Sequence, residues 1–476
     1  MKLIHSLPEV FPVTCHTDYV GLGSTFVAVN GYAFNGVDYI DTALLKGATT
    51  IVVAHDALVS QHLIDSIARS GAVLQRVGNT RHALAQLSAQ AAGFPAEKLT
   101  LIGITGTKGK TTTAWLTYEM LCSAGHKAAL MSGVCNKING IEFPAPLTTA
   151  QPDYLQQFLK LCVAYKITHV VIEVAAQALS LHRVAGLTFD AVAFTNFSHE
   201  HLEFYKNLDE YFLAKCQIID YCKPNAPLVV NNDNEWTRQC AEKYSHVVTY
   251  SCNASADLYF TLRDEVHGLH FDVLYNKKKL VFHAPALIGD YNLYNCVAAL
   301  GLALSLGVEP IDCAHALEVF IGVPGRLEIY TLANGARGVI DYAHTPDSYH
   351  AVLATLREQT NDLTVIFGAG GKRDKSKRSI MGSVAAIYAD HIILTSDNPR
   401  DEDPATIVED IRQGIDEKDM HKVAIALDRK KAILTAYKKT REGSIIALLG
   451  KGNDEYQIIG NKKTYFSERE ILEGLE

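Results

Sequence analysis

Short apolar runs, each followed at once by glycine or polar residues, recur along the chain at intervals that leave room for a helix. Runs that are apolar throughout are typical of parallel strands buried on both faces, and their alternation with helical stretches predicts an α/β fold. In such sheets, functional groups gather at the carboxyl ends of the strands. The runs lie at residues 48–54, 99–105, 169–175, 190–196, 363–371, 391–397, 423–427 and 444–452.

The same pattern divides the chain into three predicted domains. Residues 1–98 contain a strand, a glycine-rich turn, a helix closed by Gly47 and a second strand, which predict a small N-terminal α/β domain. Residues 99–324 alternate strands and helices, which predicts a central, mainly parallel sheet. A proline–glycine pair at 324–325 marks a break, and residues 325–476 predict a second, Rossmann-like sheet.

Composition excludes several classes of protein. The chain is 48% hydrophobic and 20% charged, with a net charge of −8 and no lysine- or arginine-rich block, so nucleic acid is not an expected partner. It has no apolar run of about eighteen residues and no secretory leader, so membrane insertion is not expected. The ten cysteines lie singly without a C-x-x-C pair, which disfavours disulfides and zinc. We therefore expect a cytoplasmic protein, and a monomer.

A phosphate-binding loop is predicted at residues 105–111, Thr-Gly-Thr-Lys-Gly-Lys-Thr, between a strand and a helix. The usual pattern G-x-x-x-x-G-K-[ST] requires a glycine where this chain has Ile104. Lys110 is placed to reach the β- and γ-phosphates of ATP, and the Thr111 hydroxyl is placed to ligate Mg²⁺. A glycine turn with a solvated lysine is the alternative, which the flanking strand and helix disfavour. The predicted ATP-binding residues of the loop are Gly106, Thr107, Lys108, Gly109, Lys110, Thr111 and Thr112.

The spacing T-G-T-x-G-K-T-T resembles the loop of the Mur ligase superfamily, and the resemblance extends over nearly the whole chain. The blocks "DYAHTPDS", "GGKRDKSKR", "SDNPRDEDP" and "GKGNDEYQIIG" resemble the members that add the third residue of the peptidoglycan stem peptide. The first domain resembles the family only weakly. Other matching blocks lie at residues 194–219, 288–307 and 322–328.

The resemblance implies an ATP-dependent carboxylate–amine ligase that adds meso-diaminopimelate to UDP-MurNAc-L-Ala-D-Glu through an acyl phosphate. Three alternatives stay open: a ligase with a different carboxylate donor, a catalytically weak homologue that only binds, and a nucleotide-gated switch. Retention of Lys110, Glu173, His201 and Lys215 disfavours the weak homologue. The diamino-acid pocket described below disfavours the switch.

The resemblance also assigns roles around the phosphates. Glu173 and His201 would ligate Mg²⁺ together with Thr111, and Lys215 would join them as an anionic carbamate. Taken alone, a histidine is more often a surface or core residue, and a helix lysine is more often solvated. The catalytic set would be Lys110, Glu173, His201, Lys215 and Arg326, and the further ATP contacts Asn196, Asn292, Asp341 and His344.

Two substrate sites follow from the same resemblance. Arg400 would hold the far carboxylate of diaminopimelate, because a guanidinium fork pairs with a carboxylate through two hydrogen bonds. The remaining residues of the amino-acid pocket would be Arg373, Asp397, Asn398, Pro399, Gly450 and Asp454, and the UDP-sugar and dipeptide contacts Thr17, Thr148, Thr149, Ala175 and Arg183.

The chain departs from the family mainly at the sugar-nucleotide contacts. The usual S-S-H-A-L reads Ala-Ala-Gln-Ala-Leu at residues 175–179, and the usual D-S-R reads His-Thr-Asp at residues 16–18. In the last loop, the usual histidine and glutamate are Asn453 and the shorter Asp454. The residues for ATP and metal are kept, so the ligation machinery is expected to be intact while the donor could differ.

Overall fold

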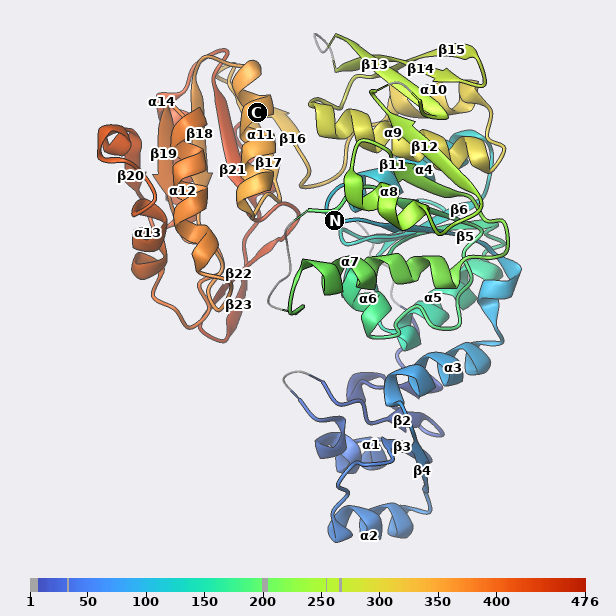
Figure 1. The fold of residues 1–476 in the computed structure, drawn as a ribbon. Helices are drawn as coiled ribbons and strands as arrows, with labels where there is room; N and C mark the ends of the chain where they lie inside the picture. The colour runs from blue at the N-terminus through green and yellow to red at the C-terminus, as the bar shows by residue number, and fades with distance from the viewer. Residues whose placement is uncertain (1–6, 32–33, 199–203, 254, 265–267) are drawn as a thin grey trace. The chain divides into compact units, whose positions relative to one another are not determined.

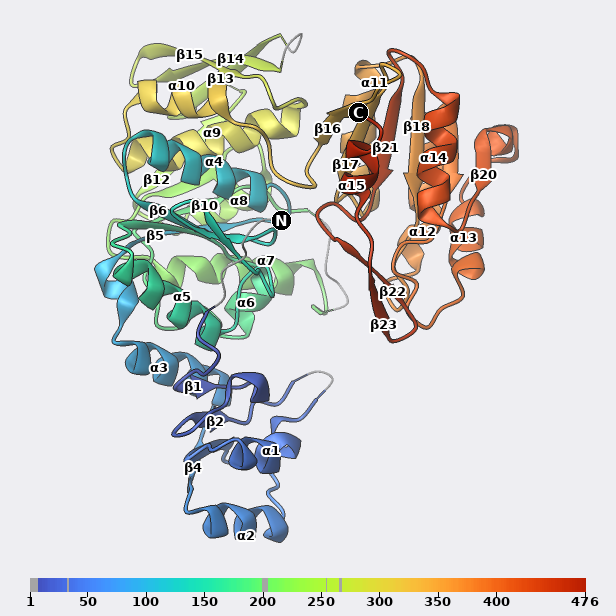
Figure 2. The same ribbon diagram turned by 180° about the vertical axis from the view of Figure 1, so that it is seen from behind.

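The computed structural model describes residues 7–31, 34–198, 204–253, 255–264 and 268–476. The chain forms two compact units, shown from opposite sides in Figures 1 and 2. The first contains residues 1–264, 270–284 and 292–320, and the second contains residues 265–269, 285–291 and 321–476. Within the described residues, no helix is long and apolar enough to cross a membrane.

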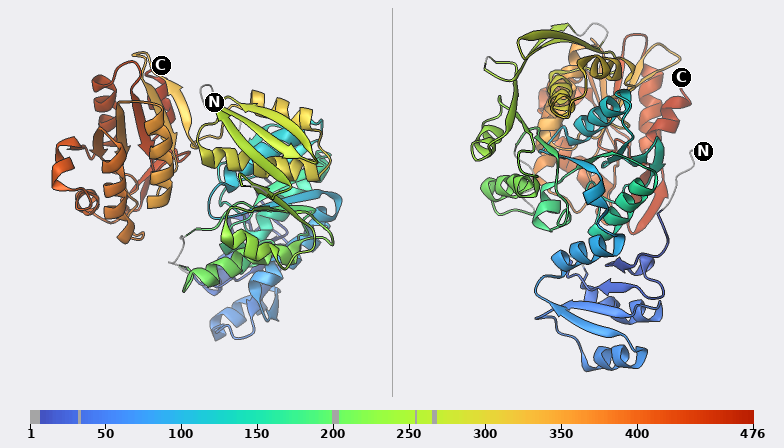
Figure 3. Two further views of the ribbon diagram at one scale, coloured as in Figure 1. Left: turned by 45° about the horizontal axis from the view of Figure 1, so that its top comes forward. Right: turned by 90° about the vertical axis from the view of Figure 1, so that its right-hand side faces the viewer.

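The first unit begins with a small sheet of four parallel strands in the order β1-β2-β3-β4. Alternate residues of β3 face opposite sides. Ile51 and Val53 pack with α1 and α2, while Val52 packs with Leu84 of α3, so helices cover both faces (Figure 3, right). The elements are β1 (Val13–Thr14), β2 (Thr25–Val27), β3 (Thr50–Ala54), β4 (Val73–Val77), α1 (Ile40–Leu45), α2 (Gln61–Ser70) and α3 (Thr80–Ala92).

The central sheet of the first unit has 11 strands in the order β15-β14-β13-β12-β11-β10-β5-β9-β6-β7-β8. The strands from β12 to β6 run parallel, which places the ends of β5, β9 and β10 at one edge. The strands are β5 (Thr100–Thr105), β6 (Ala128–Met131), β7 (Asn136–Ile138), β8 (Ile141–Phe143), β9 (His169–Glu173), β10 (Ala191–Phe194), β11 (Leu228–Asn231), β12 (Val247–Ser251), β13 (Leu258–Asp264), β14 (Leu269–Tyr275) and β15 (Lys278–Ala284).

Helices cover both faces of this sheet (Figure 1). Leu155 and Phe158 of α5 and Phe212 of α7 share a buried cluster with alternate strand residues, so α5 and α7 lie on one face. α4, α9 and α10 lie on the other, where a Cβ at Gly301 of α9 would approach Val229 to 2.8 Å. The helices are α4 (Lys110–Ser123), α5 (Pro152–Ala164), α6 (Ala176–Ser180), α7 (Leu208–Cys216), α8 (Glu235–Ala241), α9 (Asp290–Ser305) and α10 (Pro310–Val319).

The second unit is built on a six-stranded sheet in the order β16-β17-β21-β18-β19-β20, in which only β16 runs antiparallel to its neighbour. Along β21, alternate residues pack on α11, α12 and α13 or on α14 and α15. The elements are β16 (Glu328–Thr331), β17 (Arg337–Asp341), β18 (Leu363–Phe367), β19 (His391–Leu394), β20 (Val423–Ile425), β21 (Ile445–Leu449), β22 (Tyr456–Ile459), β23 (Lys462–Tyr465), α11 (Pro346–Glu358), α12 (Ser376–Tyr388), α13 (Pro404–Arg412), α14 (Arg429–Lys439) and α15 (Glu468–Glu473).

The α/β fold and the predicted parallel strands are confirmed, and the prediction missed the strands between residues 228 and 284. β14 alternates buried and partly exposed positions along its first five residues, a period-2 signal typical of a strand with one buried face. The β22–β23 hairpin was also missed, because its two strands have only four residues each and directly follow the loop after β21.

Candidate active site

The predicted phosphate loop joins the carboxyl end of β5 to the first turn of α4. Ile104 lies inside β5 and is fully buried, so the turn starts only at Gly106. Gly106 and Gly109 have φ angles of 146° and 82°. A Cβ would lie 2.0 Å from Thr195 Oγ1 at the first glycine and 2.2 Å from Asn295 Oδ1 at the second. Glycine is therefore required at these two positions and not at 104.

The residues after β10 hold this loop in shape. The amides of Thr107 and Lys108 donate to the backbone carbonyl and the side-chain Oδ1 of Asn196, both at 2.9 Å. The carbonyl of Lys108 accepts from Asn196 Nδ2 at 3.0 Å and from Thr195 Oγ1 at 2.6 Å. Asn196 thus holds the loop in shape, and its contact with phosphate oxygens stays a prediction. The N-terminus of a helix, here that of α4, is a typical binding place for phosphate oxygens, because its first amides point out of the helix end.

An oxygen-rich group lies where the loop meets β9. Thr111 Oγ1 donates to Glu173 Oε2 at 3.0 Å, and the amide of Gly133 donates to Glu173 Oε1 at 2.8 Å. Glu173 ends β9 and is fully buried. Lys110 Nζ lies 2.9 Å from the carbonyl of Gly106. Hydroxyl and carboxylate oxygens are the ligands that Mg²⁺ prefers, so the donor set fits that cation.

Helix α7 brings Lys215 to the same loop. Lys215 is buried, and its Nζ donates to the carbonyl of Gly106 at 2.6 Å while lying 4.6 Å from the ring centre of Tyr211. The Tyr211 hydroxyl is 3.3 Å from Thr107 Oγ1. His201 lies outside the described residues, and in the part of the chain that is described no three histidine, cysteine, aspartate or glutamate side chains gather as a metal site.

The predicted acyl-substrate residues adjoin Glu173. Thr149 Oγ1 donates to the carbonyl of Glu173 at 2.8 Å and accepts from the amide of Ala175 at 2.9 Å. Arg183 Nη1 donates to the carbonyl of Thr149 at 3.0 Å, and burial followed by the charge of Arg81 lowers the pKa of Arg183. Thr149 therefore connects the end of β9 to the Arg183 guanidinium.

Two other predicted substrate residues are Thr148, near Glu173, and Thr17, in the N-terminal part of the chain. A Cβ at Gly133 would lie 3.2 Å from Thr148 Oγ1, so Thr148 is next to the loop that bonds Glu173. The carbonyl of Thr17 accepts from Lys46 Nζ at 2.9 Å. Thr14 Oγ1 donates to Asp153 of α5 at 2.7 Å, which ties this segment to the central sheet.

Asn292, predicted to contact the nucleotide, reaches the loop through a second asparagine. Asn292 Oδ1 accepts from Asn295 Nδ2 at 3.2 Å, and Asn295 Oδ1 faces Gly109 and Thr113. Asn295 was missed in the sequence. Asn295 lies about one helical turn after Asn292 on the helix that begins at Asp290. This spacing places the two side chains on the same face of the helix and could have predicted that they act together.

In the second unit, Asp397 and Asn398 follow β19 and meet the loop after β21. Lys451, also missed in the sequence, is fully buried, and its Nζ lies 3.2 Å from Asp397 Oδ1 and 3.4 Å from Asn398 Oδ1. A Cβ at Gly450 would lie 3.0 Å from Asp397 Oδ2. A buried lysine needs a charged partner, and the local sequence does not show that Asp397, which comes 54 residues earlier, is that partner.

Arg400, on the loop after β19, lies against the glycine-rich loop after β18, which carries Arg373. Arg400 Nη1 donates to the carbonyl of Gly371 at 2.8 Å, and a Cβ at Gly370 would be 3.3 Å from Arg400 Nη1 and 3.4 Å from Arg373 Cγ. Arg400 has a φ of 53°, an uncommon conformation for a residue with a side chain. Its amide donates to the carbonyl of Ile458 of β22 at 3.1 Å, which fixes that backbone.

Arg326, Asp341 and His344, all in the second unit, lie close to one another. The Arg326 guanidinium lies 4.5 Å from the ring centre of Tyr342, and the rings of Tyr342 and His344 are 4.9 Å apart. Burial raises the pKa of Asp341, although Arg326 and two amides oppose the shift. Asp454, whose pKa burial also raises, has an amide that donates to the carbonyl of Lys451 at 2.9 Å.

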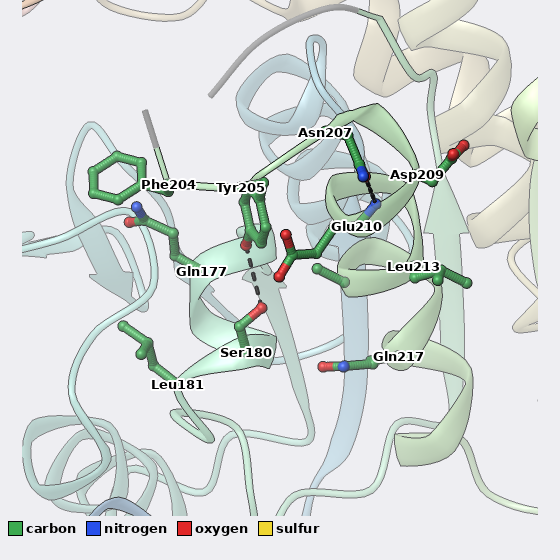
Figure 4. A pocket seen from close by; sticks show the side chains of 11 residues that line it. Gln177, Ser180, Leu181, Phe204, Tyr205, Asn207, Asp209, Glu210, Leu213 and Gln217 are labelled. Atoms are coloured by element: carbon green, nitrogen blue, oxygen red, sulfur yellow. Dashed lines mark hydrogen bonds between the residues drawn. The ribbon is translucent and has the colours of Figure 1, made fainter. Parts of the chain in front are cut away.

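A pocket of about 570 Å³ lies between α6 and α7 and contains none of the predicted site residues (Figure 4). Glu210 and Leu213 of α7 and Gln217, directly after it, line one side, while Ser180 and Tyr205, whose hydroxyls are 3.2 Å apart, lie on the other. Lys215 is not among the lining residues, although the neighbouring Ala214 is. The size of this pocket therefore does not identify the reacting centre.

A glycine pair tests the loop geometry. Gly109→Ala and Gly125→Ala both place a side chain at a φ near 80°, at the two ends of α4, and each should cost about 1 kcal/mol of stability. Only Gly109 lacks room for a Cβ, because of Asn295. We expect kcat/KM for ATP to fall roughly ten- to a hundredfold in Gly109→Ala alone. Equal values in the two variants, measured by phosphate release, would contradict the loop assignment.

Comparisons with known proteins agree with this arrangement. Residues 104–303 match the Mur ligase middle domain, and residues 325–452 match the Mur ligase glutamate ligase domain. The chain is 36% identical over 475 residues to UDP-N-acetylmuramoyl-L-alanyl-D-glutamate–2,6-diaminopimelate ligase of Aquifex aeolicus, covering 99% of this chain and 95% of the relative. The protein of the same name from Bacillus cereus is 35% identical over 472 residues, covering 98% and 93%.

Solved structures of Mur ligases are also similar to this chain. A structure of UDP-N-acetylmuramoyl-L-alanyl-D-glutamate–2,6-diaminopimelate ligase aligns with a TM-score of 0.66 at 27% identity, covering 98% of this chain and 94% of the other. MurF ligase from Thermotoga maritima in complex with ADP has the same fold, with a TM-score of 0.65 at 18% identity, covering 92% and 93%. The chain is thus similar to Mur ligases over nearly its full length, in sequence and in structure, and it has the phosphate loop and the clusters described above. The chain belongs to the Mur ligase family.

Proposed function

We propose that this ATP-dependent ligase adds meso-diaminopimelate to UDP-MurNAc-L-Ala-D-Glu in the synthesis of the peptidoglycan precursor. The observation that supports this most directly is the double role of Glu173. Its carboxylate bonds the phosphate-loop residue Thr111, and its carbonyl bonds Thr149, which the resemblance assigns to the acyl substrate. A γ-phosphate and a donor carboxylate would therefore meet at one strand end.

The reaction would proceed in two steps. The donor carboxylate oxygen attacks the γ-phosphorus, and ADP leaves with the electron pair of the broken bond. The amino nitrogen then attacks the acyl carbon, loses a proton, and releases phosphate. Lys110 and the first-turn amides of α4 would hold the phosphate oxygens, while Arg183 would hold the acyl substrate. Positioned cations stabilise the negative charge that accumulates as two anions react.

Mg²⁺ is proposed at Thr111 and Glu173, with His201 and a carbamylated Lys215 as further ligands. The bonded hydroxyl–carboxylate pair, 3.0 Å apart, supports this donor set. When bound, the cation would neutralise phosphate charge. Helix α7 places the buried Lys215 next to the phosphate loop.

Each of the three parts of the chain would bind a different substrate. We propose that residues 1–98 bind the UDP-sugar, residues 99–324 bind ATP, and residues 325–476 bind the amino acid. Arg326, Asp341 and His344 would contribute to the nucleotide site from the last of these, and the protein would act as a cytoplasmic monomer. The alternatives of a different donor and of a weak binding homologue receive no support, because the curated relatives described above carry the name of the diaminopimelate ligase.

Phosphate release with purified enzyme tests the proposal. ATP would be combined with UDP-MurNAc-L-Ala-D-Glu or UDP-MurNAc-L-Ala as donor, and with meso-diaminopimelate, L-lysine or no amino acid as acceptor. We expect rapid release only when UDP-MurNAc-L-Ala-D-Glu and meso-diaminopimelate are both present, with much slower release with L-lysine and the tripeptide product identified by mass. No release in that mixture, or equal release with the shorter donor, would contradict the proposed donor.

A further inference from the structure

Most of the predicted amino-acid residues lie on two loops that are held together by close backbone contacts. One loop follows β18 and carries Arg373, and the other follows β19 and carries Arg400. The amide of Gly371 donates to the carbonyl of Asn398 at 2.9 Å. A Cβ at Gly371 would lie 1.9 Å from the carbonyl oxygen of Pro399, so the two backbones touch. The direction of each arginine thus depends on both loops.

A fully buried arginine outside the predicted pocket braces these loops. Arg378, in the first turn of α12, has no exposed surface. Its Nη2 donates to Glu402 Oε2 at 3.0 Å and to the carbonyl of Gly370 at 3.3 Å. Its Nη1 donates to Asp410 Oδ2 of α13 at 2.8 Å. One guanidinium therefore bonds the loop after β18, the end of the loop after β19, and the helix that follows.

Glu402 is the point where the two loops join. Its Oε1 accepts from the amide of Lys372, its Oε2 accepts from Arg378, and Lys375 Nζ lies 3.3 Å away. The bonded amide of Lys372 and the Arg378 guanidinium lower the pKa of Glu402 to about 2. Lys372 has a φ of 53°. A strained backbone held by a carboxylate persists only while that bond is kept.

We propose that Arg378 and Glu402 form a positioning pair for the amino-acid substrate: by bonding both loops, they fix Arg373 and Arg400 in the geometry that recognises a diamino acid with a second carboxylate. This inference rests on the proposed function, and neither residue is placed in contact with the substrate. Site residues must be held within a fraction of an ångström, which flexible loops achieve only with support from residues behind them.

A role of the Arg378–Glu402 pair in positioning the substrate residues and a role in stability alone predict different results. If the pair only stabilises the fold, removing its charge lowers the melting temperature and reduces kcat for every acceptor alike. If it positions the arginines, the change appears in KM for meso-diaminopimelate and in the preference over L-lysine, while KM for ATP and for UDP-MurNAc-L-Ala-D-Glu stays the same. Glu402 is suited to the test, because its side chain is 18% exposed and its replacement leaves no buried cavity.

Glu402→Gln in the full-length enzyme tests the proposal, with Glu409→Gln as matched control. Glu409 is on α13 and pairs with Arg412 at 2.7 Å, without bonding either loop. We expect KM for meso-diaminopimelate to rise on the order of tenfold in Glu402→Gln and the preference over L-lysine to fall by a similar factor, with the control unchanged. Glu402→Asp should recover part of the effect.

Unchanged KM and preference in Glu402→Gln would overturn the proposal, as would a uniform loss of kcat accompanied by a lower melting temperature. Calorimetric binding of meso-diaminopimelate gives a second readout that does not require turnover. The proposed function fails separately, since an unmutated enzyme that releases no phosphate with meso-diaminopimelate would reject that function before any variant is compared.

Discussion

Lys215→Ala is expected to reduce turnover roughly a hundred- to a thousandfold, the range seen when a group that stabilises developing charge is removed. Lys215 is buried, and its Nζ lies 2.6 Å from the carbonyl of Gly106 at the phosphate loop. Reaction with CO₂ would convert the side chain into an anionic carbamate whose oxygens suit Mg²⁺. Loss of the side chain would then remove an anionic ligand and leave a gap beside the loop.

Rescue distinguishes a carbamate from a lysine that only supports the loop. Short carboxylates such as acetate or formate fit the gap and restore an anionic oxygen, so partial recovery of phosphate release is expected in Lys215→Ala. Lys206→Ala, at an exposed lysine shortly before α7, is the matched control and should retain full activity. Full activity of Lys215→Ala would reject the catalytic role, and loss without rescue by either carboxylate would reject the carbamate.

Much of the phosphate site could be predicted because its chemistry is local in sequence. Strand, glycine loop and helix are contiguous, so Gly106, Lys110 and Thr111 were identified from spacing, and the position of Ile104 was explained once β5 was seen to continue through it. Parallel strands buried on both faces gave clear apolar runs. The run at residues 169–175 predicted that Glu173 ends a strand, as it does at β9, while its role in the site came only from the family resemblance.

The parts that could not be predicted depend on contacts between distant segments. The support that Thr195 and Asn196 give the loop requires β10 to lie beside β5, which spacing does not reveal. Buried charges such as Arg378 and Lys451 sit in polar stretches that resemble solvated surface until their partners are known. The strands β13 to β15 carry no motif, and only the alternation of buried and partly exposed residues in β14 indicates a strand there.

The amino-acid preference is the second large effect. Arg400 lies beside Arg373 on two interlocked loops, and its backbone, at a φ of 53°, is held to β22 by the amide of Arg400 and the amide of Gly460, which donates to the Arg400 carbonyl at 2.7 Å. Diaminopimelate has a second carboxylate, and lysine does not. A guanidinium paired with that carboxylate in a partly desolvated pocket should favour diaminopimelate by roughly 2–5 kcal/mol, or about thirty- to several-thousand-fold.

Arg400→Ala should erase most of this preference, measured as the ratio of kcat/KM values for meso-diaminopimelate and L-lysine. Arg400→Lys keeps the charge but loses the fork, so an intermediate ratio is expected. Arg412→Ala, at an arginine paired with Glu409 on α13, is the matched control and should leave the ratio unchanged. Asp454, shorter than the family's usual glutamate, would hold the distal amino group less closely, which weakens affinity without changing the preference. Equal use of both amino acids by the unmutated enzyme would show that Arg400 does not recognise the second carboxylate.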